Sequence, residues 1–349
     1  MNGIPILQLF LALSTHSVTL EASGDLKLKD FHNTQVTRAG DILFGGLLEV
    51  WHFDSNGRLL LRVGLTGREV GQKDRLVANF FYCPRRGIYW LVDSLEQESF
   101  FYDAKGHFLG KGFFEDKQGE ENGQKVYFRY ITKAGSGIFG IDASKLVEWP
   151  ESPPLVLQKL AFDVTPRGVA VRRIGPPFCA VRPILREFNF NFKNFWIVPR
   201  GYSLNLFVVD QLSKSWRFFE YENHEYIEES EAKHSNPLYL EHWVDLPPDF
   251  KRKGLQEMQS GTMLFTSFSR ITGFYPFGDH LLVGYTVPNS DRLTYRTALQ
   301  RISIRGYSIG DAVLVEGNLL GTDGKRVYIL ETDPSSDSVK MVRMVTFDD

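Results

Sequence analysis

The sequence predicts an all-β protein, a single β-propeller of six blades in which each blade is a four-stranded antiparallel sheet and an N-terminal strand closes the ring. Three observations predict this. Aromatic side chains make up 14% of the 349 residues and favour strands over helices. A strand-turn-strand unit occurs twice, 49 residues apart, and short apolar runs recur along the chain. We expect one domain over residues 1–349.

Composition and charge limit the possible partners. Hydrophobic residues make up 43% of the chain and charged residues 23%, which is typical of a globular protein. Because 40 basic side chains face 42 acidic ones, there is no excess positive charge for a phosphate backbone, so nucleic acid is not an expected partner. Cys83 and Cys179 lie beside apolar or proline-rich sequence and are predicted to be buried free thiols.

The N-terminal apolar run, residues 4–13, bears on the location of the protein. It has no Lys or Arg before it, and it is too short to cross a bilayer, which takes about 20 residues as a helix. We interpret it as a strand of the mature fold, with a remnant of a targeting sequence as the alternative. If an export signal is missing, the protein could also associate with a membrane through it. The predicted location is periplasmic or extracellular, with the cytoplasm as the alternative.

Segments near both ends are predicted to close the ring. Residues 17–22 and 26–29 precede the first repeat and can complete the last blade. Residues 339–347 alternate apolar with polar or small side chains, which indicates a half-buried outer strand. Such closure would leave the two termini adjacent.

The clearest repeat is a hairpin. Residues 51–60, WHFDSNGRLL, return as residues 100–109, FFYDAKGHFL. Asp54 and Asp103 are placed to bond the backbone of each turn, and Gly57 and Gly106 can take the positive φ that closes it. Both segments therefore read as strand, tight turn, strand.

Six apolar runs mark the predicted blades. Taking Leu43 as the first marker, the successive spacings are 46, 50, 68, 75 and 46 residues, and blades repeat about every 40 to 50 residues. Asp93, Asp142 and Asp210 each end such a run; we expect them to cap turns rather than to bind a metal ion. The six runs are residues 42–44, 88–93, 138–142, 206–210, 281–285 and 327–330.

The succession of strand-Asp, aromatic strand, Asp-x-x-Gly and strand resembles the NHL-type repeats of bacterial six-bladed β-propeller proteins. Residues 62–69, RVGLTGRE, occupy the place of their glycine-rich turn between blades, although the usual Gly-Pro-Gly-Glu ending is missing. The resemblance implies the fold more than an activity, since most members have no assigned function. Many are exported or lipid-anchored, but no lipobox cysteine is visible in this sequence.

A repeated Pro-Arg pair suggests a ligand site. The segments Pro84-Arg85, Pro166-Arg167-Gly168 and Pro199-Arg200-Gly201 share it, and two of them precede strands. A turn explains the proline and glycine but not the arginine. Arg85, Arg167 and Arg200 are therefore candidates for holding an anionic ligand on one rim, with a solvated surface as the alternative.

Residues 219–270 depart furthest from the repeat. Long loops on a rigid scaffold commonly carry function, so we expect an interaction lobe or a lid over the channel here. The histidines of this region lack the His-Glu-x-x-His spacing of a zinc site, and no metal site is expected. The candidate interaction residues are Tyr221, His224, Tyr226 and Trp243.

No catalytic residue or cofactor is predicted, because the sequence has no Gly-x-Ser-x-Gly elbow, P-loop or dinucleotide fingerprint after a strand. We expect a monomeric scaffold that binds an unidentified protein or small ligand. One alternative is a metal-dependent propeller hydrolase or lactonase with a divalent cation in the channel. The other is an intracellular protein-interaction module.

Overall fold

The computed structural model consists of strands and their connections. It describes residues 14–21, 31–65, 75–93, 95–115, 121–134, 137–142, 156–178, 195–200, 203–209, 216–221, 238–245, 268–291, 294–303, 306–332 and 339–347. No helix occurs in these ranges, so the all-β prediction is confirmed. The described part of the chain contains no apolar helix of the length that a membrane crossing requires.

The strands of the N-terminal half form two sheets. The first is an antiparallel meander of β2 (Phe31–Val36), β3 (Ile42–Gly46), β4 (Glu49–Phe53) and β5 (Leu59–Gly64). The second combines two meanders, joined by a parallel pairing of β9 with β14. Its strands are β6 (Val77–Cys83), β7 (Ile88–Asp93), β8 (Glu98–Tyr102), β9 (Phe108–Glu115), β10 (Glu121–Lys125), β11 (Phe128–Ala134), β12 (Gly137–Asp142), β13 (Val156–Thr165) and β14 (Gly168–Phe178).

Three further sheets follow along the described chain. One is formed by β15 (Phe195–Arg200), β16 (Ser203–Val209) and β17 (Trp216–Tyr221). The next contains β18 (Ile271–Phe277), β19 (His280–Pro288), β20 (Tyr295–Ile302) and β21 (Val313–Val315). The last contains β22 (Asn318–Thr322), β23 (Val327–Thr332), β24 (Val339–Thr346) and β1 (Ser14–Val18).

The six apolar runs of the sequence lie in the second strand of each meander, namely β3, β7, β12, β16, β19 and β23. A second strand is paired on both edges, and in β3 and β7 every side chain is buried. Side chains on the two faces of β3 pack against different sheets. Phe44 lies in one hydrophobic cluster with Tyr328 of the last sheet, and Leu43 lies in another with Tyr89 of the second sheet. Burial on both faces explains why these runs are continuously apolar rather than alternating.

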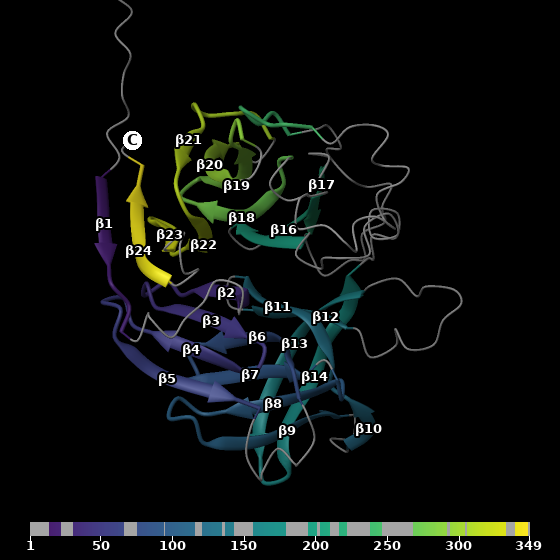
Figure 1. The fold of residues 1–349 in the computed structure, drawn as a ribbon. Coiled ribbons are helices and arrows are strands. Elements are labelled where there is room, and N and C mark those ends of the chain that lie inside the picture. Colours follow the sequence, from purple (N-terminus) through teal and green to yellow (C-terminus); the bar gives the residue numbers. More distant parts are fainter. Residues whose placement is uncertain are drawn as a thin grey trace, which may run out of the picture.

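The first strands of the meanders contact one another in a cycle. β2 contacts β6, β6 contacts β11, and the series continues through β15, β18 and β22 back to β2. In Figure 1, β2 and β11 lie near the middle of the view, and β5 and β9 lie toward its edge. The sheets are thus arranged around a common centre.

The N-terminal strand joins the C-terminal one. β1 pairs antiparallel with β24, from Ser14 opposite Thr346 to Val18 opposite Val342. The predicted closing segment 17–22 overlaps β1 at two residues; residues 4–13 and 26–29 lie outside the described ranges. The prediction of β24 as an outer strand is wrong, because β1 covers its free edge.

The hairpin repeat has the predicted turn geometry. The Asp54 carboxylate accepts hydrogen bonds from the N–H groups of Asn56 and Arg58, and Gly57 has a φ of 82°. The second copy is equivalent, since Asp103 accepts from residues 105 and 107 and Gly106 also has a φ of 82°.

Two smaller predictions concern a turn and the cysteines. Residues 62–64 belong to β5, so the predicted glycine-rich turn over residues 62–69 cannot begin before residue 65. Cys83 is a buried free thiol, as predicted, and Cys179 lies outside the described residues.

Candidate functional site

The predicted anion-binding arginines lie on two kinds of turn. Arg85 is exposed on the turn between β6 and β7, and Arg200 ends β15, directly before the corresponding turn of its own sheet. We call a connection between the first and second strands of a meander a first turn. Arg167 is also exposed, but it lies between the third and fourth strands of its meander, on the turn from β13 to β14.

Four further cations occupy described first turns, and two of them, Arg86 and Arg326, are paired with aspartates. Arg38 lies between β2 and β3, and Lys325 lies between β22 and β23; both side chains are exposed. Neither Arg38 nor Lys325 was predicted from the sequence, because neither follows a proline. The sequence nevertheless contains a usable signal, because a basic residue precedes five of the six strands that contain the apolar runs. Besides the cations before β3, β7 and β23, Lys133 precedes β12 and Arg200 precedes β16.

Hydrogen bonds and close packing place neighbouring first turns side by side. The N–H of Gly278 between β18 and β19 donates to the Gly324 carbonyl between β22 and β23, at 3.3 Å. Gly40 of the β2–β3 turn lies against the last sheet, since a Cβ there would be 2.7 Å from the Tyr328 hydroxyl oxygen.

The next seam joins β2 to β6. The Gln35 amide donates to the Tyr82 carbonyl and accepts from the Tyr82 N–H, each at 2.9 Å. Both residues lie close to the first turns that follow their strands. The turns that carry Lys325, Arg38 and Arg85 are therefore consecutive around one end of the ring.

A carboxylate holds one of these turns in shape. Asp323 accepts hydrogen bonds from the Arg326 guanidinium at 2.8 Å and from the Tyr328 hydroxyl at 2.9 Å, as well as from two backbone N–H groups. Burial alone would raise the pKa of Asp323, but these hydrogen bonds outweigh it and hold the pKa below the ordinary value. Burial and the bond to Asp323 raise the pKa of Tyr328, so its hydroxyl stays protonated.

We expect Asp323→Asn to weaken the pH dependence of stability. The folded-state pKa of Asp323 is lowered, so its stabilisation is complete above the unfolded-state value of about 3.9 and is lost as the pH falls through the folded-state pKa. Urea unfolding from pH 7 to pH 3 should show a shallower decline below about pH 4 for the variant. At neutral pH the variant should lose about 1 kcal/mol. An unchanged decline would show that this carboxylate is not coupled to folding.

A buried histidine array lies at the seam between the first two meanders. His52 on β4 is 3% exposed, and its Nδ1 is 2.5 Å from the Tyr89 hydroxyl of β7. Its Nε2 is 3.7 Å from the Asp41 carboxylate, which adjoins the Arg38 turn. Burial and nearby groups raise the pKa of Tyr89, so its hydroxyl stays protonated and shares one hydrogen bond with His52 Nδ1. These contacts join β4 to β7 beneath the turns that carry Arg38 and Arg85.

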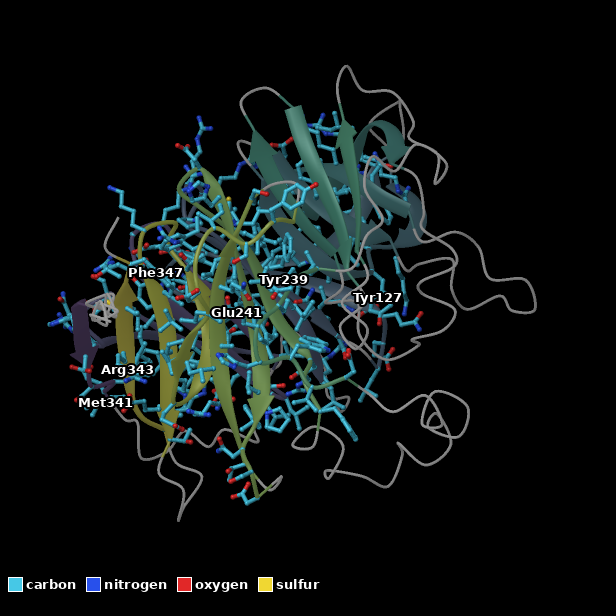
Figure 2. The ribbon with its side chains drawn as sticks, turned by 90° about the horizontal axis from the view of Figure 1, so that it is seen from above. Tyr127, Tyr239, Glu241, Met341, Arg343 and Phe347 are labelled. Atoms are coloured by element: carbon cyan, nitrogen blue, oxygen red, sulfur yellow. The ribbon has the colours of Figure 1, made fainter. Side chains whose placement is uncertain are left out.

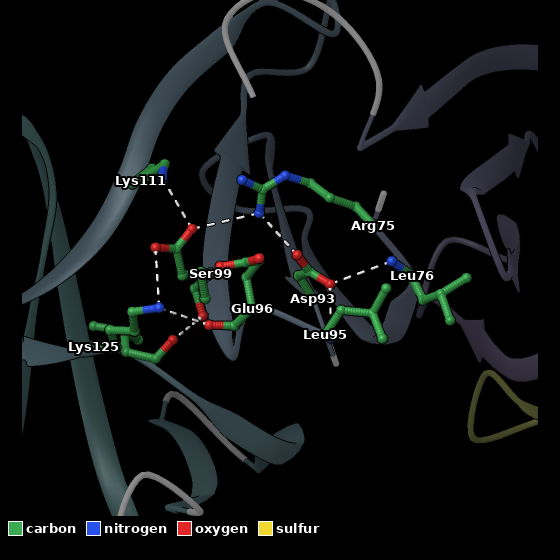
Figure 3. Close-up of polar contacts among 10 residues, drawn as sticks. Arg75, Leu76, Asp93, Leu95, Glu96, Ser99, Lys111 and Lys125 are labelled. Carbon is green, nitrogen blue, oxygen red and sulfur yellow. Dashed lines mark hydrogen bonds and ion pairs between the residues drawn. The ribbon is translucent and has the colours of Figure 1, made fainter. Parts of the chain in front are cut away.

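The opposite end of the ring holds a buried ion network (Figure 3). Asp93 at the end of β7 is fully buried and accepts a hydrogen bond from Arg75 at 2.8 Å. It also accepts from the N–H groups of Leu76 and Leu95. Asp93 thus caps a local turn, as predicted. The side chains of Asp142 and Asp210 lie outside the described residues, and the described residues contain no group of three potential metal ligands.

One described part of the predicted interaction lobe is packed into the fold. Leu238 and Leu240 belong to the core of the β18–β21 sheet, and Glu241 receives a hydrogen bond from Tyr285 on its carbonyl, at 2.7 Å. Figure 2 shows Tyr239 and Glu241 beside the strands of this sheet. Trp243 is half-buried, 5.8 Å from the Tyr285 ring. Of the other lobe candidates, Tyr221 ends β17, and His224 and Tyr226 lie outside the described residues.

Comparison with known proteins finds similarity in structure only. No protein-family model and no curated protein sequence matches this chain, so the NHL-type family remains a resemblance. The structure is similar to that of a candidate exported protein of Bacteroides fragilis, with a TM-score of 0.52 and 11% identity over 97% of this chain and 96% of that one. A member of the DUF4221 family from Bacteroides vulgatus gives 0.49 and 11% over 96% of each chain. At 11% identity the first of these shows a shared overall fold.

Proposed function

We propose that this chain is a six-bladed β-propeller that acts as a non-catalytic binding scaffold. The blades are β2–β5, β6–β9, β11–β14, β15–β17, β18–β21 and β22–β24 with β1. The observation that carries the proposal is the closed cycle of contacts between first strands, which brings turns from different blades to one end of the ring. Turns that converge on a rigid ring form a surface that can bind a ligand without chemistry.

The proposed location is outside the cytoplasm. The sequence gives this as an expectation, and the structurally similar Bacteroides fragilis protein is described as a candidate exported protein. Fractionation of the native cells, followed by detection of the protein in the periplasmic or secreted fraction, supports the proposal. Recovery only with cytosolic markers would overturn it.

A ligand screen that also measures turnover tests the scaffold function. The protein is incubated with panels of anionic peptides, sugars, lactones and esters, with and without Ca²⁺, Mg²⁺ or Zn²⁺. We expect at least one compound to raise the unfolding temperature and to be recovered unchanged by mass spectrometry. Consumption of a lactone or ester that requires the cation and stops with chelator would replace the scaffold with the metal-dependent hydrolase.

A further inference from the structure

We propose that Lys325, Arg38 and Arg85, named here the cationic arc, bind an acidic polypeptide segment; this rests on the scaffold function and specifies its ligand. The three side chains are exposed on consecutive first turns. Within the described part of the chain, none of the three has an ion-pair partner. Asp41 lies on the same turn as Arg38, and its carboxylate is 3.7 Å from His52 Nε2. A carboxylate arriving from outside would therefore meet cations that form no ion pair within the described residues.

The neighbouring cations differ from those of the arc because they already have partners within the protein. Arg86 lies beside Asp163 at 3.5 Å and over the Phe162 ring at 4.8 Å. Arg326 is 2.8 Å from Asp323. These pairs hold two first turns in fixed shapes, so the exposed Arg85 and Lys325 are presented from a rigid backbone. Such preorganisation lowers the entropic cost of binding.

Position also distinguishes the arc from general surface charge. The whole chain has a formal charge of -2. On these three turns Asp323 is paired with Arg326, so Arg38, Arg85 and Lys325 exceed the remaining carboxylate, that of Asp41, and leave a local positive surplus. The next first turn beyond Lys325 carries Asp279, which is exposed, and the surplus ends there. Because each cation lies on a separate turn, the arc matches a ligand with several spaced carboxylates better than a single small anion. Arginine and carboxylate are also matched for bidentate hydrogen bonding.

The apolar surface argues against other anionic partners. Membrane surfaces are commonly bound through exposed apolar side chains next to basic ones, and sugars or unpaired bases through exposed aromatic rings. None of the exposed large hydrophobic side chains in the described ranges lies on a first turn. Leu47, Leu48 and Leu95 lie on turns between second and third strands, at the opposite end of the ring, and Tyr307 lies between the third and fourth strands of the β18–β21 sheet. An acidic polypeptide needs only exposed cations for binding, and the first turns provide these.

The test measures binding of a fluorescein-labelled peptide of ten glutamates by anisotropy. The arc variant carries Arg38→Gln, Arg85→Gln and Lys325→Gln. The matched control carries Arg58→Gln, Lys105→Gln and Arg167→Gln, which removes the same charge from exposed turns between third and fourth strands. We expect the arc variant to bind about tenfold more weakly and the control to bind within about twofold of wild type. Both variants should keep the wild-type unfolding temperature.

The other outcomes overturn the proposal. The control turns lie beside the arc, since a Cβ at Gly87 would be 3.1 Å from Ala104 Cβ. Equal loss in both triple variants would therefore show that the peptide does not prefer the first turns, and the arc would not be its site. Arc-dependent binding of anionic vesicles, a sulfated polysaccharide or single-stranded DNA, without binding of the peptide, would assign the arc to that partner instead. Unchanged peptide affinity in the arc variant would place the site elsewhere while leaving the scaffold function standing. Failure of the scaffold function would be seen separately, as metal-dependent turnover.

Discussion

Replacing Asp93 by Ala is expected to lower the free energy of unfolding by about 3–5 kcal/mol, because it leaves the Arg75 guanidinium buried without its main partner. The side chain of Arg75 is 4% exposed and that of Asp93 is fully buried. Glu98 is 3.4 Å from Arg75 but is shared with Lys111 and Lys125, so it compensates in part. The substitution also removes the acceptor for two backbone N–H groups. Equilibrium urea unfolding measures the loss.

Two variants make this prediction specific. Asp163→Ala removes an aspartate that also pairs with arginine, but its side chain is 49% exposed, and we expect a loss within about 1 kcal/mol. Arg75→Met combined with Asp93→Asn removes the buried charge and keeps an oxygen acceptor, so it should be more stable than Asp93→Ala. Equal losses for Asp93→Ala and Asp163→Ala would contradict the role assigned to burial.

Replacing Trp90 by Ala is expected to destabilise the protein by about 3–5 kcal/mol. Trp90 is fully buried on β7, and its ring contacts Phe101 of its own meander and Phe128 and Phe162 of the next. The cavity would open where the two meanders of this sheet pack together, so both meanders should unfold at lower denaturant concentration. Chemical denaturation followed by circular dichroism measures the change.

Trp90→Phe and Leu48→Ala are the matched controls. Phe fills part of the cavity and removes an indole N–H that is buried without a hydrogen-bond partner among the described residues, so Trp90→Phe should cost less than Trp90→Ala. Leu48 is 58% exposed on the turn between β3 and β4, and its truncation should change stability by at most about 0.5 kcal/mol. A Trp90→Ala variant as stable as Leu48→Ala would contradict the packing described between these two meanders.

The strands that could be predicted are those whose burial leaves an unambiguous pattern. Second strands such as β3 and β7 are buried on both faces and appear in the sequence as continuous apolar runs. The Asp54 and Asp103 turns were also predictable, because an Asp and a Gly with fixed spacing determine the local hydrogen bonds. Fourth strands are harder, since β5 and β9 are mostly half-buried and their patterns are weak.

Groups that meet across sheets could not be predicted from sequence spacing. His52 and Tyr89 are 37 positions apart, and Gln35 and Tyr82 are 47 apart. Their contact depends on the order of the meanders around the ring, which no local pattern encodes. The Pro-Arg pattern likewise combined two kinds of turn: Arg85 lies on a first turn, whereas Arg167 lies between third and fourth strands.

Disulfide trapping of β1 against β24 tests the closed ring most directly. Ser17 lies opposite Arg343 in this pair, and directly opposed residues in antiparallel strands have Cα separations of about 4.5–5.5 Å, which a disulfide can span. We expect oxidised Ser17→Cys/Arg343→Cys to form an intramolecular link between these residues, identified by peptide mass spectrometry, and neither single variant to form one. Absence of that link, or links only between molecules, would contradict the closed ring.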